Sequence, residues 1–483
     1  MINDSSLSAL KKAKWTSQFN RPLYENYAFT CIPGTVSKLL TGKGTNPISV
    51  DAVCGRWDKY DCVIVFLIDA FGWEFFEGFA HKYPFLDRFA KEGMASKISS
   101  EFPSTTAAHI TSFNSGKEVG QTGIYEWFHY DPIPDRMIAP LLFSNAGDHD
   151  SGTLLKEGFS PQQIFPFETT YQKLAKAGVR SIAMQQESIA HSPYSKAMLA
   201  GAEIQPFVHF HDALERLVNI CKTPCDQPTY VFVYFGDIDA MGHRHGITSP
   251  QFADAIDYCW TAVENRFWRN LTHLPNRTAV IFTADHGMAP VDPKTTIYLN
   301  KIVPELSGMI KTNKAKMPLV PAGSCRDFFL HLEDKHLDEA QSKLEKQLKG
   351  VADVVYVEEL LKDGFFGSKA PSKRLRERIG NLVVLPYFQE SVFWWFEKHR
   401  FEQHFYGAHG GLTPDEMESI FLFSSIEKHY TERDSKIEIS AASKLRGGVP
   451  ASGSYVSNID PVARTQPREL SRGPNPICEP RSV

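Results

Sequence analysis

Three apolar runs constrain the fold of this chain more than any other feature. They are DCVIVFLIDAFGW (61–73), TYVFVYFGDID (229–239) and TAVIFTADHGM (278–288), and each is rich in β-branched and aromatic residues. Runs of this kind are too short for a buried helix and are typical of strands buried on both faces of a parallel sheet.

A helix is predicted between the second and third runs. Apolar residues recur there every three or four positions after Ser249 and Pro250, which is typical of an amphipathic helix that begins at an N-cap. Strand, helix and strand in this order form a βαβ crossover. We therefore predict an α/β fold with a mainly parallel central sheet and helices on both of its faces.

The chain has 483 residues, which is more than a single hydrophobic core usually contains. We therefore expect one large domain with an insertion, or two domains. Residues 1–55 are predicted as a lead-in to a core that comprises residues 56–290 and 396–435. Residues 291–395 mix charged helix-favouring stretches with short strand candidates, which predicts an inserted α+β cap. Residues 445–483 contain six Pro, four Gly and no Phe or Trp, so we expect a disordered tail.

The net charge and the cysteines indicate which classes of partner and which cellular compartment to expect. With 52 Lys and Arg against 56 Asp and Glu, the net charge of -4 gives no basic field, so we expect neither nucleic acid nor a membrane as a partner. The chain has no secretory signal pattern and no run of about 18 apolar residues. Its eight cysteines are scattered and predicted to be reduced, which favours a cytoplasmic location. The oligomeric state stays open.

An acidic residue follows each apolar run. These residues are Asp69, Asp239 and Asp285. Ligands of open α/β sheets bind beyond the carboxyl ends of the strands, so the three acids are expected to meet at one site. Buried acids without partners are costly, and a bound cation would relieve their repulsion. One such acid could simply cap a helix, but this explanation does not suit all three together.

Histidines accompany these acids. His243 lies four residues after Asp239, His286 directly follows Asp285, and His409 lies in the small-residue segment GAHGG. Carboxylate and imidazole ligands suit Zn²⁺ and also Mn²⁺ or Fe. Two clusters about 4 Å apart would form a two-metal clamp for in-line displacement at phosphorus. His109 and His245 also lie near these motifs, but we interpret them as structural histidines.

The segment EFPSTTAAHITSFNSG (101–116) offers a nucleophile. It passes from Pro and hydroxyl residues into a helix-like run, and a helix N-terminus is a favourable seat for a phosphate oxygen. Plain N-capping by Ser104, Thr105 or Thr106 is the alternative, which the nearby acids disfavour.

Together these motifs resemble the alkaline phosphatase superfamily, and within it the type I phosphodiesterase/nucleotide pyrophosphatase family. The resemblance implies two divalent metal ions, most often Zn²⁺ with Mn²⁺ possible. One ion would be held by Asp69, Thr106, Asp285 and His286, and the other by Asp239, His243 and His409. It also implies that Thr106 is the nucleophile and forms a phosphothreonine, with Thr105 as the alternative.

The chain departs from the family at its substrate-binding positions. Trp127 stands where nucleotide-cleaving members carry a phosphate-binding Asn, and Ala107 replaces the aromatic residue that follows the nucleophile. Tyr234 matches a base-stacking tyrosine of the family, although a core aromatic residue is an equal alternative. Trp127 and Tyr234 are our candidate substrate-binding residues.

The resemblance therefore predicts a metal-dependent hydrolase of phosphodiester or pyrophosphate bonds in a small phosphate-ester substrate. A phosphomonoester, phosphonate or sulfate-ester hydrolase of the same superfamily is the alternative within enzymes. A catalytically silent metal-binding protein on the same fold is the alternative from another class.

Overall fold

The computed structural model describes residues 1–148, 150–397 and 400–427 of the chain. A seven-stranded sheet with the strand order β2-β17-β9-β1-β8-β6-β7 forms its centre. Neighbouring strands from β9 to β7 are parallel, and β17 is antiparallel to both β9 and β2. In sheet order the strands are β2 (Met94–Ser99), β17 (Glu418–Ile426), β9 (Thr278–Thr283), β1 (Cys62–Ile68), β8 (Thr229–Phe235), β6 (Arg180–Gln186) and β7 (Glu203–Phe207).

The three apolar runs form β1, β8 and β9, the adjacent strands at the middle of the sheet. Every residue of β1 and of β9 is buried. The predicted helix begins at Pro250, with the side chain of Ser249 accepting a hydrogen bond from the Phe252 N–H group. The crossover from β8 to β9 passes over β1, which lies between them. The predicted mainly parallel α/β fold is confirmed.

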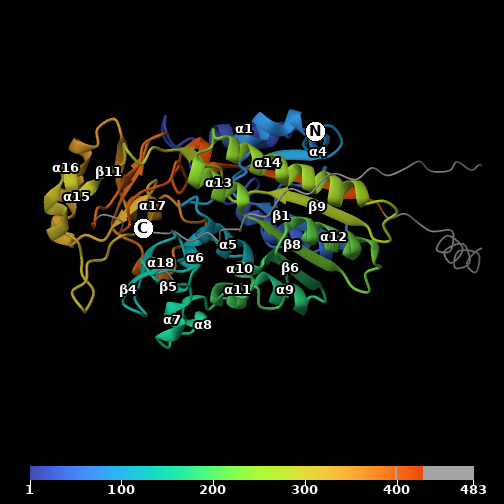
Figure 1. Ribbon diagram of the computed structural model, residues 1–483, viewed down its shortest axis with the longest axis horizontal. Coiled ribbons are helices and arrows are strands. Elements are labelled where there is room, and N and C mark those ends of the chain that lie inside the picture. Colours follow the sequence, from blue (N-terminus) through green and yellow to red (C-terminus); the bar gives the residue numbers. More distant parts are fainter. Residues whose placement is uncertain (149, 398–399, 428–483) are drawn as a thin grey trace, which may run out of the picture.

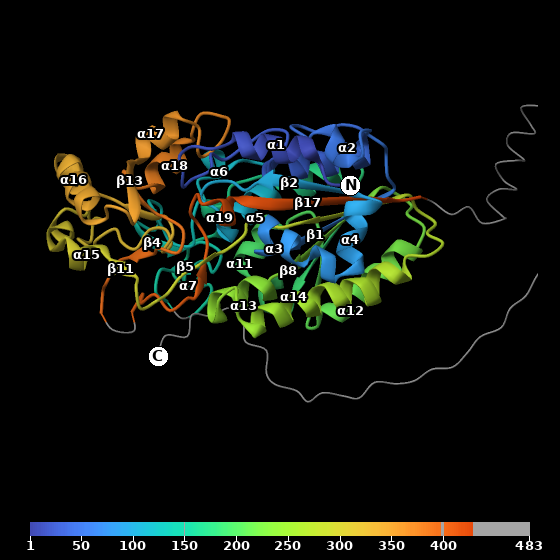
Figure 2. The same cartoon turned by 90° about the horizontal axis from the view of Figure 1, so that it is seen from above.

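Helices cover both faces of the sheet, as Figure 2 shows. Alternate residues of β1 point to opposite faces, so Ile64 and Phe66 lie in one apolar cluster while Val63 and Val65 lie in another. The first cluster includes side chains of α3 (Trp73–Phe79), α4 (Pro84–Lys91), α12 (Phe210–Lys222) and α14 (Pro250–Ala262). The second includes side chains of α1 (Asp4–Lys12), α2 (Ile32–Thr41), α5 (Thr106–Ser115) and α9 (Thr170–Lys176).

Residues 291–395 contain their own antiparallel sheet, which lies at the left of Figure 1 with its helices. Its strand order is β12-β14-β13. Side chains from both β12 and β14 pack with Phe102 and Tyr125, which lie outside residues 291–395, in one apolar cluster. The division into lead-in, core and cap stays a prediction. The elements are β12 (Phe328–Leu330), α16 (Leu337–Gln347), β13 (Ala352–Tyr356), α17 (Val357–Lys362), α18 (Lys373–Arg378) and β14 (Leu382–Pro386).

Shorter elements complete the fold. A three-stranded sheet follows α6 (Val119–Thr122), and two small two-stranded sheets connect residues 289–298 to residues 392–408. The strands of these sheets are β3 (His129–Asp131), β4 (Arg136–Ala139), β5 (Ser144–Asn145), β10 (Ala289–Pro290), β11 (Ile297–Tyr298), β15 (Val392–Phe393) and β16 (Gly407–Ala408). The remaining helices are α7 (Thr153–Lys156), α8 (Pro161–Ile164), α10 (Glu187–Ala190), α11 (Pro193–Met198), α13 (Asp237–His245), α15 (Leu299–Ile302) and α19 (Pro414–Met417).

Two further expectations concern the compartment and the tail. Every cysteine in the described ranges is free, as expected for reduced thiols. Within the same ranges, no helix has the length and apolar character needed to cross a membrane. The cytoplasmic location stays a prediction. The predicted tail, residues 445–483, and the last part of the predicted core, residues 428–435, lie outside the described residues.

The core around β9 gives a first prediction. Phe282 stacks on Phe66 with ring centroids 4.4 Å apart and meets Phe85 and Phe89 edge-on. Replacing Phe282 with Ala should lower the free energy of unfolding by about 3–5 kcal/mol, because a large cavity remains in a rigid core. Urea unfolding followed by tryptophan fluorescence measures this change. Phe388→Ala, at a side chain that is 42% exposed, is the control and should change it by about 0.5 kcal/mol or less.

Candidate active site

The three predicted acids lie together beyond the carboxyl ends of β1, β8 and β9. Asp69 directly follows β1, and Asp285 comes two residues after β9. Asp239 differs from the prediction, because β8 ends at Phe235 and Asp239 lies in the first turn of α13. There the helix places Asp239 and His243 on the same face, since residues four apart in a helix are neighbours.

Burial has the largest effect on the pKa values of these three carboxyl groups. Asp69 is 1% exposed and Asp285 is fully buried. Burial, together with the charges of the other two acids, raises the pKa of Asp69 well above its usual value. Burial also raises the pKa of Asp239, and it raises that of Asp285 to about 7. One oxygen of Asp239 and one of Asp285 are buried without any hydrogen-bond donor, so both can accept a cation.

The three predicted histidines share one hydrogen-bonding pattern. Nδ1 of His243 lies 2.7 Å from the Gly407 carbonyl oxygen, Nδ1 of His286 lies 2.9 Å from that of Gly287, and Nδ1 of His409 lies 2.9 Å from that of Ser104. A carbonyl oxygen only accepts, so each Nδ1 carries the hydrogen and each Nε2 of a neutral ring keeps a free lone pair. Carbonyl partners of this kind orient metal-binding histidines.

Burial and neighbouring imidazoles keep two of these rings neutral. The pKa values of His286 and His409 lie well below the usual value, chiefly because both rings are buried. The rings of His286 and His409 are stacked with their centroids 3.7 Å apart. Nε2 of His409 lies only 3.0 Å from Nε2 of His243. Both Nε2 atoms also lie within 3.5 Å of the same Asp239 carboxylate oxygen.

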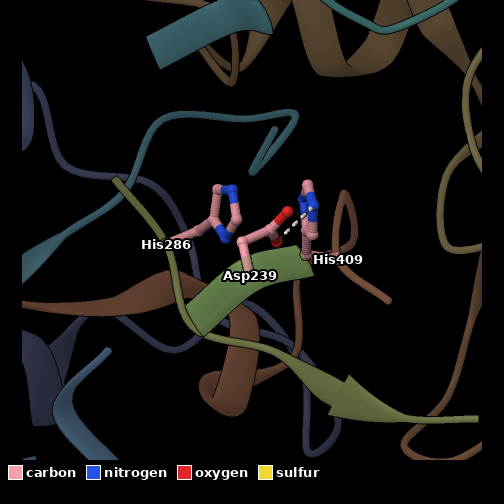
Figure 3. Close-up of side chains that lie close together, drawn as sticks. All are labelled: Asp239, His286 and His409. Carbon is pink, nitrogen blue, oxygen red and sulfur yellow. Dashed lines mark ion pairs between the residues drawn. The ribbon is translucent and has the colours of Figure 1, made fainter. Parts of the chain in front are cut away.

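The ligand atoms form two overlapping groups that could each hold a metal ion. One contains Asp69, Asp285 and His286, and the other contains Asp239, His286 and His409, with all ligand atoms of a group within 4.8 Å of one another. Figure 3 shows Asp239 reaching from α13 toward His409, where the carboxylate oxygen and Nε2 are 3.5 Å apart. His243 Nε2 adds a contact of 3.3 Å to the same Asp239 oxygen. The donor set and its unpartnered oxygens fit divalent metal ions.

The two threonines of the candidate nucleophile segment have different surroundings. Thr105 is the N-cap of α5: its hydroxyl accepts from the Ala108 N–H group and donates to the Tyr125 carbonyl oxygen. Thr106 is the first residue of the helix, and its hydroxyl oxygen lies 3.2 Å from His286 Nε2 and 3.4 Å from a carboxylate oxygen of Asp69. Of residues 101–115, Thr106 alone is not buried. The geometry therefore favours Thr106 over Thr105 as the reacting group.

His109 lies near the site without being available to it. Its Nε2 accepts from the Glu101 N–H group at 2.8 Å, and its Nδ1 lies 2.7 Å from the Thr105 carbonyl oxygen. The His109 ring therefore connects the backbone of Glu101 to that of Thr105, the two ends of the loop that precedes Thr106. The structure agrees with the interpretation of His109 as a structural histidine, and His245 is exposed on α13.

The candidate substrate residues are placed differently from one another. The Tyr234 hydroxyl donates a short hydrogen bond to Asp69, so this side chain contacts the acid cluster itself. Trp127 is half-buried in the segment that follows Tyr125, and among the described residues it has no ring contact or hydrogen bond with the seven predicted ligands. Ala107, the residue after Thr106, is buried in an apolar cluster.

Sequence motifs missed the residues that hold the His409 loop. Glu416 is fully buried and makes a two-pronged ion pair with Arg326, with N–O distances of 3.0 and 2.8 Å. The same carboxylate accepts from the Gly411 N–H group at 2.9 Å, two residues after His409. Ser104 also contacts this loop, because its hydroxyl donates to the Gly411 carbonyl oxygen. Glu416 could have been noticed in the sequence because it lies in the motif HGGLTPDEM. Its partner Arg326 could not, because it is distant in the sequence.

Comparison with known proteins assigns the chain to a family. Residues 63–411 match the family described as Type I phosphodiesterase / nucleotide pyrophosphatase. The chain belongs to this family. The family predicted from the sequence, within the alkaline phosphatase superfamily, is confirmed.

A human relative and three solved structures extend the comparison. Human ectonucleotide pyrophosphatase/phosphodiesterase family member 7 is 25% identical over 238 residues, which are 45% of this chain and 48% of that protein. The chain thus spans about half the length of this curated relative. Murine ectonucleotide pyrophosphatase / phosphodiesterase 5 has 16% identity and a TM-score of 0.54, covering 81% of this chain and 97% of that chain.

The human form of that protein has 16% identity and a TM-score of 0.52, with the same coverage of 81% and 97%. An inactive variant of the murine protein in complex with AMP has 17% identity and a TM-score of 0.52, covering 75% of this chain and 87% of that chain. At these identities the likeness shows a common fold.

The buried ion pair gives a second prediction. Arg326→Met leaves the Glu416 carboxylate buried without its partner, so it should lower the free energy of unfolding by about 3–5 kcal/mol. The double variant Arg326→Met/Glu416→Gln should recover a large part of this loss, because no charge then stays buried. Urea unfolding of the four proteins in this double-mutant cycle measures the coupling. Additive losses would show that the pair does not support the His409 loop as described.

Proposed function

We propose that this protein is a hydrolase of phosphodiester or pyrophosphate bonds that uses Thr106 as its nucleophile and two divalent metal ions. The observation that carries the proposal is the position of the Thr106 hydroxyl beside His286 and Asp69, at the N-terminus of α5. Family membership supports the reaction class. In the murine relative of known structure, the inactive variant carries a threonine-to-alanine replacement, which agrees with a threonine nucleophile.

The ligands would divide between two positions. Asp69, Thr106, Asp285 and His286 would surround the ion beside the nucleophile, and Asp239, His243 and His409 would surround the second ion. Bound there, the ions would supply positive charge that lowers the pKa of a hydroxyl or water and offsets the charge on the phosphate oxygens. Zn²⁺ suits the mixed carboxylate and imidazole donors best, and Mn²⁺ is the alternative.

The residues of the chain carry the reaction in two steps. Thr106 loses its proton, its Oγ1 forms a bond to phosphorus, and the opposite P–O bond breaks, so that the leaving oxygen departs and is protonated. The start of α5 has N–H groups without intrahelical partners, which can hold the phosphate oxygens. Water then attacks phosphorus, and the Thr–O–P bond breaks to release the product and restore Thr106.

Two features of the site favour a diester or pyrophosphate over the alternatives. A monoester carries an additional negative charge, yet within the described residues no Lys or Arg is hydrogen-bonded or ion-paired to any of the seven ligands. A silent binding protein would not need a nucleophile, whereas the Thr106 hydroxyl is partly exposed beside the cluster. The proposed substrate is therefore a small phosphate diester or pyrophosphate.

A substrate panel tests the reaction class and the metal requirement. The protein should hydrolyse bis-p-nitrophenyl phosphate or a dinucleotide faster than p-nitrophenyl phosphate and p-nitrophenyl sulfate. Chelation should abolish this turnover, and added Zn²⁺ or Mn²⁺ should restore it, because the proposed reaction requires the positive charge of the two ions. Initial rates with each substrate measure both effects. A preference for the monoester or the sulfate would support the alternative hydrolases of the same superfamily. If no substrate is hydrolysed with metals bound, the catalytically silent metal-binding protein is supported.

Replacement of the nucleophile tests the mechanism. Thr106→Ala should reduce kcat for the diester by about a thousandfold or more, because the variant lacks the Oγ1 atom that forms the bond to phosphorus. Metal content measured by mass spectrometry should change little, since the carboxylates and imidazoles remain. Thr105→Ala is the matched control: it removes the N-cap of α5, costs about 1 kcal/mol of stability and should keep most of the activity. The opposite result for the two variants would make Thr105 the nucleophile.

A further inference from the structure

The side chain of Phe405 is an exposed aromatic ring beside the metal-site histidines. It is 43% exposed, and its ring centroid lies 4.6 Å from that of His243. Most large apolar side chains near the site are buried in the core, so an open ring at this place loses the free energy that burial would provide. It would gain that free energy when an apolar group covers it.

The chain holds Phe405 in place rather than leaving it on a loose loop. The side-chain amide of Gln403 accepts from the Phe405 N–H group at 2.7 Å and donates to the Phe405 carbonyl oxygen at 3.1 Å. Gln403 is itself only 6% exposed. The next residue, Tyr406, donates its N–H group to the His243 carbonyl oxygen at 2.9 Å. These bonds connect the segment to the end of α13, so the ring is preorganised beside His243.

The position of Phe405 relative to Thr106 decides which part of a substrate it meets. Thr106 contacts Asp69 and His286 on one side of the site, whereas Phe405 packs on His243, which contacts Asp239 and His409 on the other side. In an in-line displacement the leaving oxygen departs opposite the attacking oxygen. With the nucleophile beside the first ion and His243 beside the second, as proposed above, a ring packed on His243 would lie on the side of the leaving group.

We infer that Phe405 is a specificity-determining residue that contacts the leaving group, and that this protein favours phosphodiesters whose leaving group is aromatic. The inference rests on the proposed function, because it assigns the two sides of the site from the nucleophile. Offset or edge-on contact between the Phe405 ring and an aromatic leaving group adds to the free energy of apolar burial. An aliphatic leaving group of equal acidity gains only part of this interaction.

Two esters with matched leaving groups test the inference in the metal-loaded protein. Methyl phenyl phosphate and methyl hexafluoroisopropyl phosphate release alcohols of similar acidity, but only one carries an aromatic ring. The wild-type protein should have the higher kcat/KM for the phenyl ester. Phe405→Ala should lower kcat/KM for this ester by about tenfold, which corresponds to about 1.4 kcal/mol, and change that of the fluoroalkyl ester by about twofold or less.

Two further variants separate leaving-group contact from support of His243. Phe405→Leu keeps an apolar side chain against His243 and should lose much of the phenyl preference while keeping the metal content of the wild type. Phe388→Ala removes an equally exposed phenylalanine, 42% against 43%, and should change neither ester. Equal losses for both esters in Phe405→Ala, or a lower metal content, would overturn the inference, because Phe405 would then only support the metal site.

The same experiment distinguishes failure of the inference from failure of the proposed function. Hydrolysis of both esters by the wild type with no preference, and equal rates in Phe405→Ala, would overturn only the role of Phe405. If the metal-loaded wild type hydrolyses neither ester nor bis-p-nitrophenyl phosphate, the proposed function fails and the inference fails with it.

Discussion

The repulsion between two buried carboxyl groups and a third, partly exposed one is the constraint on which the functional region depends. Asp69, Asp239 and Asp285 meet where three parallel strands end, and their surroundings supply no cation from Lys or Arg within the described residues. Burial raises the pKa of each group, because the charged forms are poorly solvated there. Burial of acids without cationic partners is unfavourable, and a bound divalent cation would relieve that cost.

The surrounding backbone orients the three histidines of this cluster. Carbonyl oxygens lie beside Nδ1 of His243, His286 and His409, and the Nε2 atom of each ring faces a carboxylate oxygen of the cluster. If these rings were charged, they would neutralise the acids without any ion. Burial opposes that outcome, because it lowers the pKa of His286 and His409 well below the usual value.

Segments distant in sequence cooperate to hold the site. Residues 407–411 return after the small sheet of residues 328–386 and meet the loop before α5 through Ser104. Arg326, two residues before β12, neutralises the Glu416 carboxylate that accepts from the Gly411 N–H group. The near-neutral composition of the chain is compatible with an anionic substrate in this arrangement, because two bound ions rather than Lys or Arg would provide the local positive charge.

Most of the fold was predictable from sequence because local patterns carry it. The apolar runs of β1, β8 and β9 require burial on both faces, and the N-cap at Ser249 starts its helix by a local hydrogen bond. Asp239 shows where local reasoning fails: the end of β8 is decided by Gly236 and the start of α13, which the apolar pattern does not mark. Trp127 shows a second limit, since the resemblance to the family gives it a position in a motif but not a contact in the site.

The sequence by itself determined the family, the α/β class and the set of acids, histidines and threonines at the site, because those residue types recur in motifs with short, fixed spacing. Only the tertiary structure decided that Thr105 caps α5 while Thr106 faces His286, that Tyr234 bonds Asp69, and that Phe405 lies exposed against His243. These relations join residues up to about 180 positions apart, and their geometry follows from packing across the sheet, which no local spacing encodes.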